Sequence, residues 1–376
     1  MIYFDNAATT KPSEKALQSA DKYNKEQFFN PSALYRGGLD CAADIKIAKE
    51  SILKTVNAQP KDYEVIFTSC GSEGDNQAIF CCVKRGVFVT DAGEHSAVYK
   101  AFVELKNRGL KTELIGLNRD GSVKTDELFD FIEKNAEVSF VSIMHVNNET
   151  GAINDVNYIA DRIKTINPKI IMHVDGVQAF GKLPYKISDK IDFYVASAHK
   201  INGLKGCGAI IKRKKTNLNP LIFGGGQENG LRSGTENVFG IKVFGFVAKE
   251  HYENIEDNYR KVSEIKEYIS DNLDKTVYTI ISGEKSSPYI LSVAATGLRG
   301  EVLMHMLETK GIVVGNGSAC SSKNRYSRVL AACGYTEKVL DGVLRISFSA
   351  DNTLEEAETA VEIINACGKE LKEKMK

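Results

Sequence analysis

The sequence lacks the features of exported, membrane-spanning and nucleic-acid-binding proteins. No stretch approaches the ~20 consecutive apolar residues that a membrane helix needs. Residues 1–11 contain neither the cationic nor the apolar region of a secretory signal. The formal net charge is zero, with 49 Lys and Arg residues against 49 Asp and Glu residues, which argues against nucleic acid or an anionic membrane as the main partner. We therefore expect a soluble, cytoplasmic protein.

The spacing of the eight cysteines does not match a metal-binding motif either. They include no C-x-x-C pair, so the paired spacings of a structural zinc site are absent and we expect no metal site. In a chain without export signals, these cysteines are expected to be reduced thiols that mostly fill the core. The sequence also lacks internal repeats and low-complexity segments.

Length and apolar pattern predict two α/β domains. The 376 residues exceed the usual size of one hydrophobic core. A long amphipathic helix is expected at residues 238–272, and residues 352–356 have the pattern of a helix amino-terminal cap. We predict a large domain of residues 15–255 and a smaller α/β domain made of residues 1–14 and 256–376.

Short apolar runs in the first of these domains alternate with helical patterns. This alternation indicates a mostly parallel sheet covered by helices on both faces. The strands are expected at residues 64–68, 87–90, 112–117, 140–144, 170–174, 191–196 and 207–212. Ligands of such sheets bind at the carboxyl ends of the strands. Seven polar residues fall at these ends: His95, Asn148, Asp175, Gln178, Ser197, His199 and Lys200.

Lys200 ends a Ser-Ala-His-Lys segment that directly follows the apolar run at residues 191–196. Poor hydration at the end of a buried strand would lower the pKa of the ammonium group. A neutral lysine amine can form a Schiff base with a carbonyl compound. The alternative is a strand that runs into a surface loop, where Lys200 is simply solvated.

Residues 69–74 (Ser-Cys-Gly-Ser-Glu-Gly) are predicted to be a turn between a strand and a helix that begins at Asp75. Free backbone N–H groups and the helix dipole at such a turn favour phosphate, here near Gly71 and Ser72. The segment matches neither a Walker loop nor a dinucleotide fingerprint. Many similar turns bind nothing, so the turn alone decides little.

Together these residues suit pyridoxal 5′-phosphate. Lys200 could bind its aldehyde, Asp175 could keep its ring nitrogen protonated, and His95 could stack on the ring and transfer protons. The remaining cofactor contacts would come from Gln178 to the ring oxygen and from Ser72, Ser197 and His199 to the phosphate. Each residue also has an ordinary alternative, since strand-end aspartates often cap helices and lone histidines are usually structural.

Two further residues stand out in the carboxyl-terminal part. Cys320 is surrounded by glycine and serine rather than by apolar residues, which is typical of an accessible nucleophilic or redox thiol. Arg345 lies in an apolar strand and would need an anionic partner if buried. A substrate carboxylate could supply that partner.

At this point the sequence resembles the cysteine desulfurases, NifS/IscS-like members of the class V pyridoxal-phosphate-dependent aminotransferases. The resemblance extends over residues 3–353, and its most specific segments are residues 197–200, 224–228, 232–238 and 318–322. It implies the aspartate-aminotransferase fold (fold type I), with a large mostly parallel sheet and a smaller α/β domain. Departures from the family pattern occur at Tyr35, Cys70, Gly74, Asn202 and Leu204.

The resemblance also implies roles for individual residues. Lys200, Asp175 and His95 match catalytic positions, and Cys320 matches the cysteine that forms a persulfide. Further matches are cofactor ligands and substrate-carboxylate ligands: Gly71, Ser72, Asn148, Gln178, Ser197, His199, Thr235 and Arg345. Thr235 matches a phosphate ligand donated by a second subunit, which implies a homodimer with shared active sites.

The implied reaction converts L-cysteine to L-alanine and passes sulfur from Cys320 to an acceptor protein, for iron–sulfur cluster assembly or for tRNA thiolation. The alternatives are a selenocysteine lyase, another class V lyase or aminotransferase, and a scaffold that kept the fold without catalysis.

Overall fold

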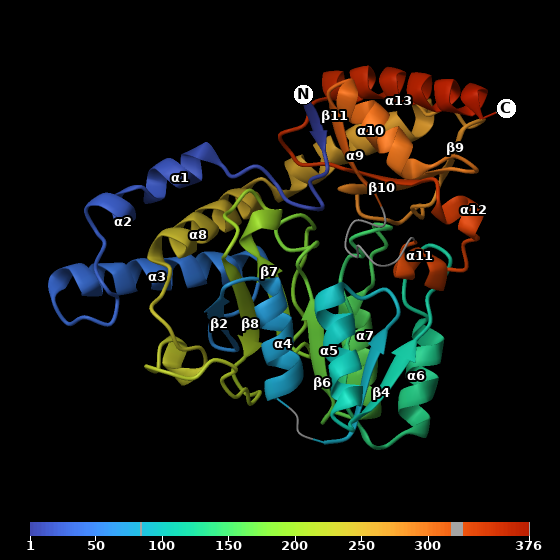
Figure 1. Cartoon of the computed structure of the whole chain (residues 1–376). Helices are drawn as coiled ribbons and strands as arrows, with labels where there is room; N and C mark the ends of the chain where they lie inside the picture. Colours follow the sequence, from blue (N-terminus) through green and yellow to red (C-terminus); the bar gives the residue numbers. More distant parts are fainter. Residues whose placement is uncertain (83–84, 317–325, 376) are drawn as a thin grey trace.

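The computed structural model describes residues 1–82, 85–316 and 326–375. In this part of the chain the strands form one seven-stranded and one five-stranded sheet. Figure 1 shows the larger sheet in the lower half of the molecule. Above it lie the smaller sheet, both chain termini and the helices α9 (Ile255–Asn272), α10 (Gly300–Thr309) and α13 (Leu354–Lys374).

The larger sheet is mostly parallel, as predicted. Its order is β2 (Tyr63–Thr68), β8 (Gly208–Arg213), β7 (Phe193–Ser197), β6 (Ile171–Asp175), β5 (Val138–Ser142), β3 (Val87–Asp91) and β4 (Lys111–Ile115). The pairs from β7 to β4 are all parallel, whereas β8 is antiparallel to both of its neighbours. Only β8 therefore runs against the other strands.

Helices cover both faces of this sheet because its strands are apolar on both sides. On β7, Phe193 and Val195 pack with α4 (Gly71–Cys81), while Tyr194 and Ala196 belong to the cluster on the other face. The first face also carries α5 (Ser96–Asn107). The second face carries α3 (Arg36–Thr55), α6 (Thr125–Lys134), α7 (Val156–Ile166) and α8 (Val238–Glu253).

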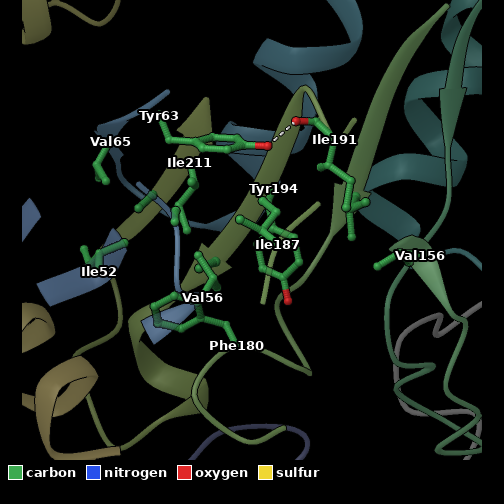
Figure 2. Packing of buried hydrophobic residues seen from close by; sticks show 14 of the residues in the cluster. Ile52, Val56, Tyr63, Val65, Val156, Phe180, Ile187, Ile191, Tyr194 and Ile211 are labelled. Carbon is green, nitrogen blue, oxygen red and sulfur yellow. Dashed lines mark hydrogen bonds between the residues drawn. The ribbon is translucent and has the colours of Figure 1, made fainter. Parts of the chain in front are cut away.

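Figure 2 shows the core on this second face, where Tyr63 and Tyr194 are the labelled side chains that carry a hydroxyl. The Tyr63 hydroxyl donates to the backbone oxygens of Ile191, at 2.8 Å, and Ser188, at 2.7 Å. These two bonds satisfy a hydroxyl that is otherwise buried among Ile187, Ile211 and other apolar residues. They also fix the loop that leads into β7.

The smaller sheet combines the two ends of the chain. Its order is β1 (Ile2–Phe4), β11 (Ile312–Asn316), β12 (Val343–Ser347), β10 (Ile290–Ala295) and β9 (Tyr278–Ile280). Only the β1–β11 pair is parallel. The predicted domain boundaries, which assign residues 1–14 to the small domain, stay a prediction. The predicted cap of the last helix is confirmed, because Thr353 and Glu356 form a capping box.

Two predicted elements differ from the structure. The helix predicted at residues 238–272 is interrupted at Asn254, whose side chain donates to the Glu250 oxygen at 2.8 Å, and α9 starts afresh at Ile255. Helix α4 begins at Gly71 rather than at Asp75. A Cβ on Gly71 or Gly74 would lie 2.9–3.0 Å from Val177 or Val195, so these glycines permit close packing rather than a turn.

The remaining elements are short. They are α1 (Glu14–Ala20), α2 (Lys22–Lys25), α11 (Arg328–Ala332), α12 (Glu337–Leu340), and the 3₁₀ turns η1 (Ala198–Lys200) and η2 (Glu228–Gly230).

We expect Tyr63→Phe to lower the free energy of unfolding by about 1–2 kcal/mol, because the buried Ile191 oxygen and the half-buried Ser188 oxygen lose their donor. Urea unfolding of the cofactor-free protein measures this change. Tyr158→Phe is the matched control, since Tyr158 is 50% exposed. Equal stability of the two variants would contradict the structural role given to the Tyr63 hydroxyl.

Candidate active site

A cavity of about 400 Å³ opens at the carboxyl ends of the parallel strands. It brings together ten of the residues predicted from the sequence: Gly71, Ser72, His95, Asn148, Asp175, Gln178, Ser197, His199, Lys200 and Arg345. It is also lined by residues that the sequence did not single out: Asp5, Ala7, Ala8, Cys70, Asp75, Met144, Glu149, Val177 and Asn316. The strand-end pattern was therefore sufficient to find the large-sheet side of the site.

Neighbouring strands hold Asp175 and Lys200 close together. In the β6–β7 pair, Asp175 lies opposite Val195, so β7 ends two residues further on at Ser197 and leads directly into η1. Lys200 is partly buried and lines the cavity instead of pointing into bulk solvent. Its Nζ donates to the backbone oxygens of Ala7, at 2.7 Å, and Ala8, at 2.9 Å.

Asp175 is buried, and its Oδ1 accepts a hydrogen bond from the Val177 N–H at 3.0 Å. Burial raises the pKa of Asp175, while the interaction with His95, the Val177 hydrogen bond and the positive charge of Lys200 oppose this rise. A cationic group in the cavity would favour the ionised carboxylate in the same way.

His95 occupies the amino-terminal cap of α5, where its Nδ1 accepts from the Ala97 N–H at 3.2 Å. Burial lowers the pKa of His95, and the charges of Lys200 and Arg328 lower it further against the effect of Asp175. The ring is therefore neutral near pH 7. Because Nδ1 accepts a hydrogen bond, the neutral ring carries its proton on Nε2.

The amino terminus of α4 and the end of β7 form a cradle suited to an anion. Ser72 lies in the first turn of α4, where backbone N–H groups are not used by the helix. Ser197 Oγ is buried and has no hydrogen-bond partner among the described residues. His199 Nδ1 lies 3.2 Å from Thr9 Oγ1, and burial lowers the pKa of His199 to about 4.

Arg345 reaches the cavity from β12 and is buried against the amino-terminal arm. Its Nη2 donates to Asp5 Oδ1 at 2.8 Å, and its Nη1 donates to the Asn148 backbone oxygen at 2.9 Å. Asp5 is therefore an anionic partner within the chain, which the sequence did not indicate. Arg345 Nε is buried and has no partner among the described residues, and each Nη keeps a second N–H.

Gln178 lines the cavity, but its amide is already engaged at both ends. Its Nε2 donates to the Ala7 oxygen at 2.9 Å, and its Oε1 accepts from Lys182 Nζ at 3.2 Å. Lys182 is buried, and this burial lowers its pKa to about 7. One N–H of the Gln178 amide is left to face a ligand.

Two predicted residues do not appear in this cavity. Thr235 is exposed on the segment that follows η2 and does not line it. Cys320 lies outside the described residues. Described residues close to it on both sides along the chain do reach the site, since Asn316 lines the cavity and Ser327 donates to Glu149, another lining residue.

Comparison with known proteins identifies the family. The model of the class-V aminotransferases matches residues 2–359. The chain belongs to this family. A NifS/IcsS protein homologue of Lactobacillus delbrueckii subsp. bulgaricus is 33% identical over 370 residues, covering 95% of this chain and 94% of the relative. Cysteine desulfurase IscS of Methanosarcina thermophila is also 33% identical, covering 96% and 91%.

Solved structures agree with the class-V assignment. A NifS-like protein superposes with a TM-score of 0.90 at 30% identity, covering 97% of this chain and 98% of the other. A structure described as SspA in complex with cysteine gives a TM-score of 0.82 at 27% identity, covering 93% and 99%. The predicted family, fold class and pyridoxal 5′-phosphate cofactor are thereby confirmed for this class-V chain.

The described helices include none that is long and apolar enough to cross a membrane. In the same described part of the chain, His, Cys, Asp and Glu form no cluster of three or more suited to a metal ion.

Two buried histidines near the sheet make folding pH-dependent. Burial lowers the pKa of His145 and of His173 to about 3, below the value of about 6.5 in an unfolded chain. As the pH falls from 6.5 towards 3, only the unfolded chain takes up these protons, so stability decreases. Each histidine contributes a slope of about 1.4 kcal/mol per pH unit.

We expect His145→Gln to reduce the slope of unfolding free energy against pH by about 1.4 kcal/mol per unit between pH 4 and 6. Urea unfolding at several pH values measures it. His305→Gln serves as the control because His305 is exposed. An unchanged slope in the His145 variant would show that this imidazole is protonated in the folded protein.

Proposed function

We propose that this protein is a cysteine desulfurase, which converts L-cysteine to L-alanine and passes the sulfur through a persulfide on Cys320. The observation that carries the proposal is the single cavity in which Lys200, Asp175, His95 and Arg345 meet. Relatives with 33% identity over almost the whole chain carry the names cysteine desulfurase IscS and NifS/IcsS homologue.

The cavity fits pyridoxal 5′-phosphate by its chemistry. Ser197 Oγ is a buried donor with no partner among the described residues, and it lies beside the amino terminus of α4, so an anion is the missing partner. Lys200 would hold the aldehyde carbon, Asp175 the ring nitrogen and Gln178 the ring oxygen. Ser72, Ser197 and His199 would hold the phosphate. When bound, the cofactor supplies an electron sink for carbanion chemistry.

Arg345 would bind and orient the substrate carboxylate. Each Nη uses one N–H to bond Asp5 or the Asn148 oxygen, which leaves a second N–H on each for the substrate. A guanidinium held on two sides loses little side-chain freedom when it binds a carboxylate. Asn148 would line the same end of the cavity.

His95 and Lys200 would move protons. The Nε2–H of neutral His95 would donate a hydrogen bond to the substrate sulfur and so favour loss of the thiol proton. Lys200 Nζ would take the proton from the substrate Cα and later return one to the product. His95 suits its task near neutral pH because burial lowers its pKa and keeps the ring neutral.

Cys320 would accept the sulfur. Its thiolate attacks the substrate sulfur, the carbon–sulfur bond breaks, a sulfur–sulfur bond forms, and alanine leaves. The described residues on both sides support this role, since Asn316 lines the cavity and Ser327 contacts Glu149. The persulfide would then pass to an acceptor protein, in iron–sulfur cluster assembly or in tRNA thiolation.

We also propose that the protein forms a homodimer. Large apolar side chains are exposed on the segment from Phe28 to Ile47 and again at Phe223, which is 81% exposed. Exposed apolar patches of this kind mark protein contacts. Thr235 follows Phe223 in sequence and would reach the phosphate in the partner's cavity. The described cysteines are free thiols, which suits a reducing cytoplasmic compartment.

We expect Cys320→Ala to lower sulfide release from L-cysteine at least about a hundredfold while leaving cofactor absorbance intact, because only the sulfur acceptor is removed. Cys81→Ala, in a half-buried thiol at the far end of α4, is the control. Sulfide release at the native rate in the Cys320 variant would overturn the proposed sulfur transfer. Alanine formation from L-selenocysteine, unaffected by Cys320→Ala, would instead indicate a selenocysteine lyase.

Mixing Lys200→Ala subunits with Thr235→Val subunits tests the shared site. If Thr235 acts across the interface, each mixed dimer contains one intact site, and random mixing restores about a quarter of native activity. Sedimentation of each variant checks that both dimerise. No recovery on mixing two inactive dimeric variants would place Thr235 in the cavity of its own subunit.

A further inference from the structure

Four buried polar side chains lead from the cavity into the large sheet, and the proposed mechanism uses none of them. They are Asp75 on α4, His173 on β6, Ser142 on β5 and Glu94 in the turn before α5. Asp75 lines the cavity beside Asp175. Exposure is 1% for Asp75 and 0% for the other three. Buried ionisable groups of this kind need partners or a changed protonation state.

The four side chains face one another in sequence. His173 Nε2 lies 3.3 Å from Asp75 Oδ1, and His173 Nδ1 lies 2.8 Å from Ser142 Oγ. Ser142 Oγ lies 3.3 Å from Glu94 Oε1. By hydrogen-bond geometry neither Asp75 Oδ1 nor His173 Nε2 has a partner among the described residues, so His173 does not donate to Asp75 from Nε2.

The sheet fixes this arrangement. Ser142 lies directly opposite His173 in the β5–β6 pair, which brings the hydroxyl to the imidazole. His173 and Asp175 are two residues apart on one strand, so both side chains project from the same face, towards α4. Glu94 directly precedes His95. The four groups therefore link the region of Asp175 with the turn that carries His95.

The pKa shifts of these four groups determine which of them hold protons. Burial raises the pKa of Asp75 and of Glu94 well above the usual range, and the carboxylate of Asp175 raises both further. Burial lowers the pKa of His173 to about 3, so its imidazole is neutral. A neutral imidazole accepts a proton at one nitrogen and donates from the other, and a serine hydroxyl does the same with one oxygen.

We propose that Asp75, His173, Ser142 and Glu94 form a proton chain that keeps Asp75 uncharged while Asp175 is ionised. The Ser142 hydroxyl donates to Glu94 Oε1, so its oxygen accepts the Nδ1 proton of His173. His173 Nε2 then carries no proton and faces Asp75 Oδ1, which holds one. No charge moves along the chain in this arrangement, and Asp75, His173 and Ser142 are all neutral.

The four residues act as positioning residues, because they set the charge beside Asp175 without any role as proton donor to the substrate. With Asp75 neutral, the Asp175 carboxylate has no like charge next to it. Other titratable or charged groups also act on the chain or on Asp175: Cys70, Asp91, His95, Lys200 and Arg328. The benefit to a cofactor ring rests on the proposed function, whereas the proton chain itself does not.

Infrared difference spectroscopy of the cofactor-free protein tests the chain directly. At neutral pH, we expect Asp75→Asn to remove a carbonyl band of a protonated carboxylic acid. Ser142→Ala should shift the pH at which that band disappears by at least about half a unit, a threefold change in proton affinity. His173→Gln should shift it likewise.

Matched controls separate this effect from simple repacking. Ser139→Ala lies on the same strand, where its hydroxyl donates only to the Val87 oxygen, and His145→Gln removes another fully buried imidazole. Neither should move the band. The proposal would be overturned if Asp75→Asn removed no band of a protonated carboxylic acid. Equal shifts in Ser139→Ala and Ser142→Ala would overturn it as well. The cofactor-free readout keeps this outcome independent of desulfurase activity.

Discussion

The site depends on the pairing between β6 and β7. This parallel pair places the end of one strand, with Asp175, beside the end of the next, from which Ser197 and Lys200 follow. The Gly176 N–H donates to the Val195 oxygen at 3.0 Å and extends the pairing one residue past Asp175. A Cβ on Gly176 would lie 2.0 Å from Tyr194 Cε1, so any larger residue there would displace the buried Tyr194 ring.

The carboxyl edge of the large sheet also holds several ionisable side chains that are shielded from water. Asp75, Asp91, Glu94 and Asp175 are all buried, and burial raises the pKa of each. Four ionised carboxylates could not coexist there, because each would lack hydration and repel the others. One ionised carboxylate can remain there, provided that a cation such as Lys200 lies near it and that the other carboxyl groups hold protons. The electrostatics thus select Asp175 for the charged role.

Sequence patterns predicted the large-sheet part of the site because parallel strands impose a simple rule. Each apolar run ends at the same edge, so His95, Asp175, Ser197 and Lys200 could be grouped from the order of residues alone. The rule does not extend to Asp5, Ala7 or Ala8, which precede every strand of that sheet. Their place depends on the β1–β11 pairing with a segment some 300 residues away, as the register of Ile2 with Ile312 shows. Local patterns carry no information on such pairing.

The glycines at residues 69–74 led to a wrong prediction, again because a local sequence pattern does not reveal tertiary packing. In residues 69–74, Gly71 and Gly74 suggested a turn, yet both lie in the first turns of α4. Their lack of a side chain serves contact with Val177 and Val195, a requirement set by the sheet and not by the backbone of the segment itself. Thr235 and Cys320 are the predicted site residues that the described part of this single chain does not place in the cavity.

The amino-terminal arm gives the site a property that neither sheet has alone. The Ala7 oxygen accepts from both Lys200 Nζ and Gln178 Nε2, while Asp5 holds Arg345. Backbone carbonyl oxygens of the arm orient the Lys200 amine, and the positive charge of Lys200 lowers the pKa of Asp175. The arm thus connects the residue that would bind the cofactor with the residue that would bind the substrate. A change in the small sheet that moves β1 would therefore disturb both at once.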